Sequence, residues 1–345
     1  MVKLTPSTAV RSPNALTRPV AWRMSVKIRL SIVSPDSTPD RIGRIHRYPL
    51  AMSSYIQTAS GLLHWRDYGG GGEVIVLVHG LGGSVANWDA VGPRLADMGR
   101  TVALDLPGFG LSPPASDWEL DTHAGAVEAF IAEFGPSATL VGNSMGGLLS
   151  EMVASRAPQT VDSLVLVAPA TPPRLPDPRI HWPTARRLAL QATPVVGRAV
   201  SRHFLQRLTP EELVNLSLET ITRKPGRVPM PLVEEFVKLA AVRMELPWAE
   251  EAIPNTGRSI ARMFRKPSSF VTMIRGIRAP TLVLHGLEDR IVSPTAVEWL
   301  CSLRPDWQFV QMGDTGHVPQ LDAPIRFLDT IVPWLQASLK REITA

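Results

Sequence analysis

Short, fully apolar runs recur along this chain and predict the strands of one buried sheet. After a hairpin-like pair of segments around Gly61, YIQTA and LLHWRDY, the runs are VIVLVHG (74–80), TVALDLPG (101–108), ATLVGNS (138–144), SLVLVAP (163–169), TLVLHG (281–286) and WQFVQMG (307–313). Apolar residues fill consecutive positions in these runs, which is typical of parallel strands buried on both faces. The pattern therefore predicts an α/β fold whose mostly parallel, eight-stranded sheet has helices on both faces.

Helical periodicity predicts the elements between these strands. The segments with this periodicity are 86–98, 121–134, 145–157, 294–303 and 325–339. The alternation stops after Pro169, because residues 171–279 contain no comparable apolar strand and instead combine proline-rich turns with basic amphipathic stretches. We therefore expect a core made of residues 52–170 and 280–345, with a helical cap or lid, residues 171–279, inserted after the sixth strand.

Charge is distributed unevenly along the 345 residues, whose net charge is +5. Residues 1–51 carry nine Lys and Arg against two acids, and residues 171–279 carry eighteen against nine, whereas the predicted core is acidic. An acidic body with a basic insertion argues against a nucleic-acid partner. The insertion is instead expected to dock on the body or to face an acidic substrate or anionic lipid, so peripheral contact with an anionic membrane is a hypothesis.

The first 51 residues are rich in Pro, Ser, Arg and Thr and are predicted to be a disordered basic tail. They lack the continuous apolar segment and the cleavage site of a secretory signal. Met52 opens a segment typical of a domain start, so translation from Met52 is one interpretation and a targeting or tethering arm is the other. The single cysteine, Cys301, excludes an intramolecular disulfide and fits a cytoplasmic protein, with membrane association as the alternative.

One serine stands where a predicted buried strand meets a predicted helix. Residues 142–146, Gly-Asn-Ser-Met-Gly, have the pattern G-x-S-x-G. Such a turn needs small residues two positions either side of the serine, because the strand and helix backbones pass closely. It presents the hydroxyl above the sheet, and the helix N-terminus stabilises negative charge there. We interpret Ser144 as a nucleophile; a simple helix cap in a glycine-rich turn is the alternative.

A serine nucleophile needs a base, usually a histidine that is oriented by a carboxylate. Of the eight histidines, His317 lies in a polar loop, GDTGHVPQLDAP, between the last predicted strand and the last predicted helix. Asp289 follows the strand that ends at Gly286, with Glu288 beside it as the alternative acid. We predict that Ser144, Asp289 and His317 form a catalytic triad.

Glycines after the first long strand predict a site for the oxyanion. In HGLGGS (79–84) they let the backbone approach a ligand, and the N–H groups of Leu81 and Met145 are the expected donors to the negatively charged oxygen. The residues expected to contact substrate are Gly80, Gly82 and Asn143. We expect His79 to brace this loop and Asp105, in DLPGFGLS, to be structural.

Five segments together resemble the α/β-hydrolase superfamily. They are HGLGGS, DLPGFGLS, GNSMGG, HGLEDRIV and GHVPQLDAP, in the order of that family. The resemblance implies the α/β-hydrolase fold and an acyl-enzyme mechanism with no cofactor and no metal. Haloalkane dehalogenases and epoxide hydrolases share the fold but carry Asp at the nucleophile position, where this chain has Ser144.

The resemblance leaves several functions open. A serine esterase or lipase-like enzyme, acting on a small-molecule ester with an apolar acyl group or a ring, is favoured because the predicted cap is rich in apolar side chains. A carbon–carbon hydrolase of meta-cleavage products is the first alternative, since GNSMGG resembles those enzymes, although Val318 follows His317 where they commonly carry Trp. Cofactor-free haloperoxidase-like proteins share the triad, and a non-catalytic ligand-binding member of the fold is a further alternative.

Overall fold

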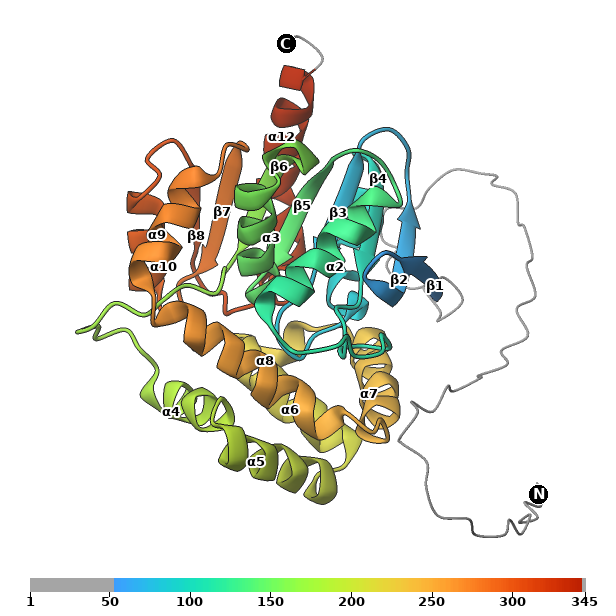
Figure 1. The fold of residues 1–345 in the computed structure, drawn as a ribbon, viewed down its shortest axis with the longest axis vertical. Coiled ribbons are helices and arrows are strands. Elements are labelled where there is room, and N and C mark those ends of the chain that lie inside the picture. Colours follow the sequence, from blue (N-terminus) through green and yellow to red (C-terminus); the bar gives the residue numbers. More distant parts are fainter. Residues whose placement is uncertain (1–52, 343–345) are drawn as a thin grey trace, which may run out of the picture. The chain divides into compact units, whose positions relative to one another are not determined.

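Eight strands form one sheet in the computed structural model, which describes residues 53–342 (Figure 1). Their order is β1-β2-β4-β3-β5-β6-β7-β8. Strands β1 (Ser53–Thr58) and β2 (Gly61–Gly69) form an antiparallel hairpin, β2 pairs antiparallel with β4, and all other neighbours are parallel. The predicted eight-stranded, mostly parallel sheet is confirmed. The predicted tail, residues 1–51, and the alternative start at Met52 lie outside the described residues.

The six remaining strands coincide with the apolar runs of the sequence. They are β3 (Val74–Val78), β4 (Arg100–Leu104), β5 (Ala138–Asn143), β6 (Val161–Val167), β7 (Thr281–Gly286) and β8 (Gln308–Met312). Every residue of β5 and β7 is buried, as a sheet covered on both faces requires. Parallel strands end at the same edge of a sheet, so the loops after β3, β5, β7 and β8 converge there.

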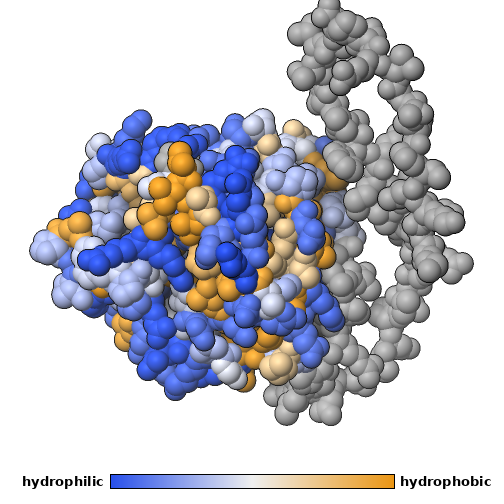
Figure 2. Space-filling model, turned by 90° about the horizontal axis from the view of Figure 1, so that it is seen from below, coloured by the Kyte–Doolittle hydropathy of each residue, from blue (hydrophilic) through white to orange (hydrophobic). Residues whose placement is uncertain are grey.

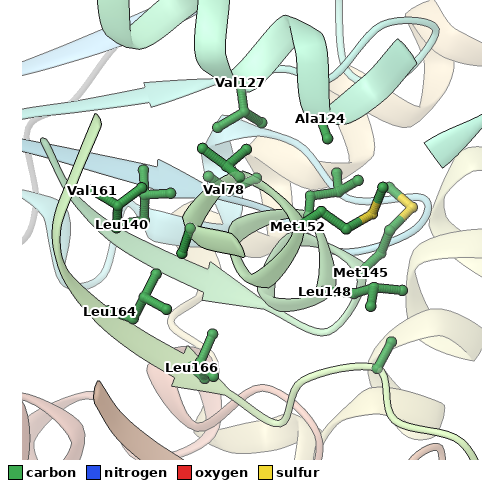
Figure 3. Close-up of a cluster of buried hydrophobic side chains, with 14 of the residues drawn as sticks. Val78, Ala124, Val127, Leu140, Met145, Leu148, Met152, Val161, Leu164 and Leu166 are labelled. Atoms are coloured by element: carbon green, nitrogen blue, oxygen red, sulfur yellow. The ribbon is translucent and has the colours of Figure 1, made fainter. Parts of the chain in front are cut away.

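Helices cover both faces of this sheet. On one face lie α2 (Leu120–Ala132), α3 (Met145–Arg156), α9 (Pro267–Gly276) and α10 (Pro294–Ser302), and on the other lie α1 (Gly92–Leu95) and α12 (Pro324–Glu342). Figure 3 shows Val127 of α2 and Leu148 and Met152 of α3 packed over strand residues such as Leu140 and Leu164. This packing fixes the start of α3 against the sheet.

The helix predicted over residues 86–98 is wrong. That segment contains a 3-10 helix, η3 (Val85–Trp88), followed by the single helical turn α1. Pro93 lies in the first turn of α1, and a proline cannot donate the hydrogen bond that would continue a preceding helix. The preceding Gly92 also disfavours a helix interior, and its lack of a side chain is required because a Cβ there would lie 2.7 Å from ring atoms of Tyr68.

The segment after β6 is helical, as predicted. Within the described residues it contains α4 (Trp182–Gln191), α5 (Pro194–Arg207), α6 (Pro210–Ile221), the 3-10 turn η5 (Pro225–Arg227), α7 (Met230–Met244), α8 (Ala249–Phe264) and α9. We call α4 to α8 the cap helices. Helix α9 falls inside the range expected for the cap, yet its Phe270 and Ile274 pack with the residues of α3 against the sheet.

The outer surface of the cap helices carries exposed apolar side chains. They include Trp182 and Leu190 of α4 and Val195 and Val196 of α5. Figure 2, seen from the cap side, shows apolar groups set among polar ones on this face. No helix among residues 53–342 has both the length and the apolar character to cross a bilayer. Contact of this surface with an anionic membrane stays a prediction.

A buried carboxyl group in α3 should make the stability of the fold depend on pH. Glu151 is fully buried and neither carboxylate oxygen has a hydrogen-bond partner among the described residues, so burial raises its pKa well above the usual range. As pH rises above about 5, the unfolded chain releases this proton while the folded chain retains it. The free energy of unfolding contributed by Glu151 therefore falls as pH rises.

Glu151→Gln should remove this pH dependence. We expect the melting temperature of the variant to exceed that of the parent by about 2 °C or more at pH 8, and the gap to shrink towards pH 5. Thermal melts of both proteins at several pH values measure the difference between their melting temperatures. The effects of all other titrating groups are common to both proteins and cancel in this difference. A gap that does not change with pH would show that Glu151 is ionised in the folded protein.

Candidate active site

The chain turns sharply at Ser144, between the last residue of β5, Asn143, and the first of α3, Met145. Ser144 has φ 55° and ψ −118°, which an L residue rarely adopts. Its N–H donates to the carbonyl of Val167 at 2.9 Å, and its carbonyl accepts from the N–H of Ala170 at 3.0 Å. The end of β6 therefore holds the serine in a sharp strand-to-helix elbow.

Two glycines make this turn sterically possible. A Cβ on Gly142 would lie 2.4 Å from the carbonyl oxygen of Gly146, and a Cβ on Gly146 would lie 2.1 Å from the carbonyl oxygen of Val78. Both contacts involve backbone atoms, which cannot move aside. The close passage of strand and helix expected from G-x-S-x-G is thus what the structure contains.

His317 and Asp289 form a buried pair. Nδ1 of His317 lies 2.7 Å from Oδ2 of Asp289. The N–H of His317 donates to the carbonyl of Ile221 at 2.8 Å, which ties the histidine loop to the end of cap helix α6. Glu288, the alternative acid, accepts instead from the N–H of Thr315 at 3.0 Å. Asp289 is therefore the acid that contacts the predicted base.

The surroundings of Asp289 favour its ionised form. Its Oδ1 accepts from the N–H groups of Ile291 and Val292, at 2.7 and 3.0 Å. Burial alone would raise the pKa of Asp289, but the charge and hydrogen bond of His317 outweigh it, with help from His285 and the Ile291 N–H, and the pKa is lowered. An ionised Asp289 accepts a hydrogen bond from Nδ1–H of His317, so that Nε2 carries no proton in the neutral ring.

Backbone donors lie where the sequence predicts an oxyanion site. The N–H of Leu81 has no hydrogen-bond partner among the described residues, and Met145 is the first residue of α3, where the N–H has no partner within the helix. Leu81, Met145, Gly80 and Gly82 line the same cavity as Ser144. A Cβ on Gly80 would lie 3.0 Å from Cβ of Ser144, so the loop passes directly beside the serine.

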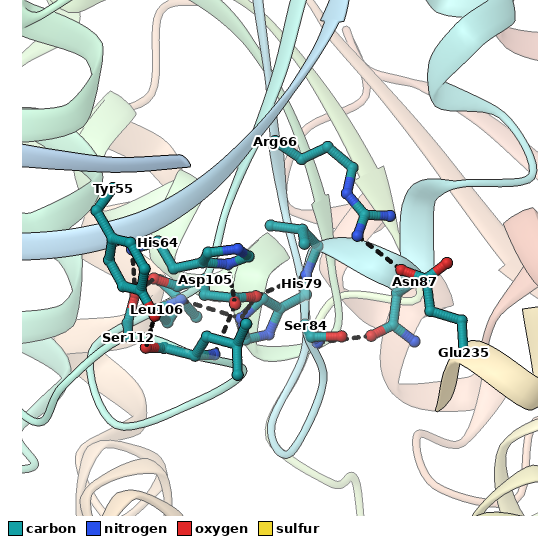
Figure 4. A network of polar contacts seen from close by, with 12 residues as sticks. Tyr55, His64, Arg66, His79, Ser84, Asn87, Asp105, Leu106, Ser112 and Glu235 are labelled. Carbon is teal, nitrogen blue, oxygen red and sulfur yellow. Dashed lines mark hydrogen bonds and ion pairs between the residues drawn. The ribbon is translucent and has the colours of Figure 1, made fainter. Parts of the chain in front are cut away.

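Asp105 supports the loop of residues 79–84 through the polar network of Figure 4. Its carboxylate accepts from Nδ1 of His64 at 2.6 Å and from the N–H groups of Val85 and Leu111 at 2.7 and 2.8 Å. His79 donates through Nδ1 to the carbonyl of Gly80 and accepts at Nε2 from the N–H of Leu106. Burial lowers the pKa of His79, so a neutral ring braces the loop. These contacts agree with the structural roles expected for Asp105 and His79.

Asn143 links the elbow to the histidine loop. Its Nδ2 donates to the carbonyl oxygens of Val167 and His317, at 3.0 and 3.1 Å. The residue also lines the cavity, as expected for a substrate contact. Its amide hydrogens are nevertheless engaged by the protein, so Asn143 positions the loop that carries His317.

Ser144 and His317 open into one cavity of about 660 Å³ between the sheet edge and the cap helices. Most side chains that the cap contributes are apolar, among them Leu188, Phe204, Phe236, Met244, Trp248 and Phe264. Volumes of this order suit small organic ligands. No group of three or more metal-ligating side chains occurs among residues 53–342. The cavity is thus an apolar chamber with a serine and a histidine in its wall.

Two polar side chains near this site escape sequence analysis. Arg243 of α7 lines the cavity and donates through Nη1 to the carbonyl of Gly82 at 2.7 Å. His285 of β7 is fully buried with its Nε2 3.8 Å from Oδ2 of Asp289, and burial lowers its pKa. Arg243 stands in no local motif, and His285, the first residue of HGLEDRIV, gives no sign in the sequence of its contact with Asp289. The sequence shows that residues 171–279 are rich in arginine, but it does not distinguish Arg243 from the other arginines of this segment.

The family of the chain follows from comparison with known proteins. The model of the alpha/beta hydrolase fold family matches residues 73–324. The chain belongs to the α/β-hydrolase family. In the solved structures, a meta-cleavage product hydrolase from Pseudomonas fluorescens IP01 superposes with a TM-score of 0.66 at 23% identity, covering 84% of this chain and all of that one. At this identity the likeness concerns the fold.

Curated relatives are more diverse in activity. The chain is 28% identical over 282 residues to a pimeloyl-[acyl-carrier protein] methyl ester esterase of Pectobacterium carotovorum, covering 80% of this chain and 99% of the relative. A 2-hydroxymuconate semialdehyde hydrolase of Pseudomonas sp. CF600 is 29% identical, with 77% and 88% covered. A dihydrolipoyllysine-residue acetyltransferase component of an acetoin cleaving system from Pseudomonas putida is also 29% identical, covering 76% of this chain and 63% of that protein. The relatives of this α/β-hydrolase therefore include a methyl ester esterase and a hydrolase of 2-hydroxymuconate semialdehyde.

Proposed function

We propose that this protein is a carboxylic ester hydrolase that acts on an ester with an apolar acyl group or ring through an acyl-enzyme on Ser144. The observation that carries the proposal is the convergence at one apolar cavity of a serine held at positive φ and a histidine hydrogen-bonded to a buried carboxylate. An ester-cleaving relative matched over nearly its whole length supports the same reaction class.

In the acylation step, Nε2 of His317 takes the proton of the Ser144 hydroxyl as its oxygen attacks the ester carbon. The carbonyl oxygen becomes an oxyanion, to which the N–H groups of Leu81 and Met145 donate. The tetrahedral intermediate then collapses, and His317 passes the proton to the departing alcohol. The products of this half-reaction are the alcohol and an acyl group bonded to Ser144.

Deacylation repeats these steps with water as the nucleophile. His317 takes a proton from water, the hydroxide attacks the acyl carbon, and the proton returns to the oxygen of Ser144. His317 keeps its Nδ1 proton throughout, in a hydrogen bond to the ionised Asp289, which stabilises the imidazolium that forms in each half-reaction. The chemistry uses only side chains and backbone groups of this chain, and the apolar cavity wall holds the acyl group.

Carbon–carbon cleavage of a meta-cleavage product is the second candidate, because a hydrolase of 2-hydroxymuconate semialdehyde is 29% identical to this chain. Such a product carries a carboxylate and a dienol or dienone in place of the ester group. In this chain Val318 follows His317, whereas those enzymes commonly carry Trp at that position.

A substrate panel distinguishes the two reactions. We expect p-nitrophenyl and methyl esters of graded acyl length to be hydrolysed, with little cleavage of a meta-cleavage dienoate. The measurement is kcat/KM for each compound with the same enzyme preparation, alongside labelling by a fluorophosphonate probe. Cleavage of the dienoate without ester hydrolysis would reverse the ranking, and absence of turnover and labelling would favour a ligand-binding role.

A further inference from the structure

The side chains around the cavity carry an unbalanced charge. Two arginines, Arg187 of α4 and Arg243 of α7, line it, whereas no aspartate or glutamate does among the described residues. Neither arginine lies within 4 Å of a carboxylate in the described part of the chain. A charged group in an apolar site is costly unless it is paired. A ligand that brought a negative charge into the cavity would supply the missing partner.

Arg243 is better placed than Arg187 to receive such a ligand. One of its nitrogens, Nη1, donates to the carbonyl of Gly82 at 2.7 Å, and its other nitrogens have no partner among residues 53–342. The planar guanidinium is thereby held by one edge, with donors left over for a second group. Burial lowers the pKa of Arg243, with Asp105 opposing this effect, but a guanidinium remains protonated in proteins.

The carboxylate that opposes the lowering of the pKa of Arg243, Asp105, already has hydrogen-bond partners. Asp105 accepts hydrogen bonds from Nδ1 of His64 and from two backbone N–H groups, and it lies between His64 and His79 in Figure 4. Glu235, also on α7, pairs with Arg66 of β2 at 2.6 Å. The nearby acids therefore leave Arg243 without a direct carboxylate contact.

The position of Arg243 relative to the oxyanion site limits the distance between the negative charge and the ester group of the ligand. Gly82 is the residue after Leu81, and two residues span at most about 7 Å. Together with the 2.7 Å hydrogen bond, this places Nη1 within about 10 Å of the N–H of Leu81. An anion bound by Arg243 therefore lies within reach of a short or medium acyl chain whose ester carbonyl occupies the oxyanion site.

We propose that Arg243 binds a carboxylate at the far end of the acyl group, so that the preferred substrates are half-esters of dicarboxylic acids. This inference rests on the proposed ester hydrolase function and names its substrate class. Hydrolysis of such a half-ester consumes one water and yields the alcohol and the free diacid. The methylene chain lies against the apolar cavity wall, and Arg243 holds the carboxylate at the end that is not cleaved.

Paired substrates that differ only in terminal charge test this directly. Monomethyl adipate, methyl hexanoate and methyl 6-aminohexanoate share an acyl chain of six carbons and end in an anion, a methyl group and a cationic amine. We expect kcat/KM to fall in that order, with a preference of about tenfold to a hundredfold for the anionic over the neutral ester, mainly through KM. Equal values for the anionic and neutral esters would overturn the proposal.

Variants assign the preference to a residue. In Arg243→Met the ratio of kcat/KM for anionic over neutral ester should fall to about one, whereas Arg243→Lys should keep part of it, since lysine retains charge without the planar fork. Arg187→Met removes the same charge from the same cavity and is the matched control; we expect its ratio to change less than about threefold. If both methionine variants lose the preference equally, the preference comes from the overall positive electrostatic potential of the cavity, and the assignment to Arg243 is wrong.

If Arg243 only shapes the loop at Gly82, Arg243→Met would lower kcat for both esters and leave the ratio of their kcat/KM values unchanged. That outcome also overturns the proposal.

A binding experiment does not depend on turnover. Calorimetric titration of the parent protein with adipate and hexanoate should show about tenfold or greater tighter binding of adipate. Hydrolysis of the neutral ester without charge preference overturns only this inference. Failure of all ester hydrolysis with adipate still bound overturns the proposed function and the substrate class with it, and leaves only a carboxylate-binding site at Arg243.

Discussion

Ser144→Ala should lower kcat for a p-nitrophenyl ester by about a million-fold, because it removes the attacking oxygen while the rest of the site stays in place. The side chain of Ser144 makes no hydrogen bond among the described residues, and both backbone bonds that hold the elbow survive the substitution. The variant should therefore fold with a melting temperature close to that of the parent. Steady-state kinetics and fluorophosphonate labelling, followed by mass spectrometry of the labelled peptide, measure the loss.

Ser150→Ala is the matched control for this variant. Ser150 is also a buried serine of α3, but its Oγ donates to the carbonyl of Gly146 at 2.7 Å within the helix. We expect this control to retain labelling and most of its activity. Labelling that persists in Ser144→Ala, or a residual rate above about one per cent of the parent, would mean that another group attacks the ester.

The strands were the most predictable part of the fold. Consecutive apolar residues in VIVLV and TLVLHG exclude a one-sided sheet, and this local signal is the same property that buries β3 and β7 in the structure. The helix expected over 86–98 failed because its apolar spacing is compatible with a helix, whereas Gly92 and Pro93 impose a break. The spacing of apolar residues indicates which face of a segment is buried. It does not show where a missing backbone hydrogen bond, such as the one at Pro93, interrupts a helix.

The residues of the candidate site differ in the same way. Ser144, Asp289 and His317 stand in short segments directly after predicted strands, so the convergence of parallel strands brings them to one edge. Arg243 is separated from Gly82 by 161 residues, and their contact depends on how α7 crosses the sheet edge. No sequence signal fixes that crossing, because amphipathic helices of a cap can pack in several orientations.

Asp289→Asn should lower kcat by about ten-thousand-fold with little change in KM, through the wrong tautomer of His317. In the parent, Oδ1 of Asp289 accepts from Ile291 and Val292 N–H groups while Oδ2 faces Nδ1 of His317. The same two N–H groups will hold the amide oxygen of the asparagine and turn its NH₂ towards the imidazole. Nδ1 must then accept a hydrogen bond, so the ring proton moves to Nε2 and the base is lost.

The adjacent acid provides the control for this prediction. Glu288→Gln changes the same charge one residue away, where the carboxylate contacts the N–H of Thr315, and we expect less than about a tenfold loss of kcat. Kinetics of both variants on one ester, with circular dichroism to compare their folds, decide between the two acids. A larger loss in Glu288→Gln than in Asp289→Asn would make Glu288 the orienting acid, and a loss below tenfold in both would leave His317 acting without a carboxylate. The geometry favours the larger loss in Asp289→Asn. Within residues 53–342, the hydrogen-bond partner of Oδ2 of Asp289 is Nδ1 of His317, and Nε2 of His285 lies 3.8 Å from the same oxygen.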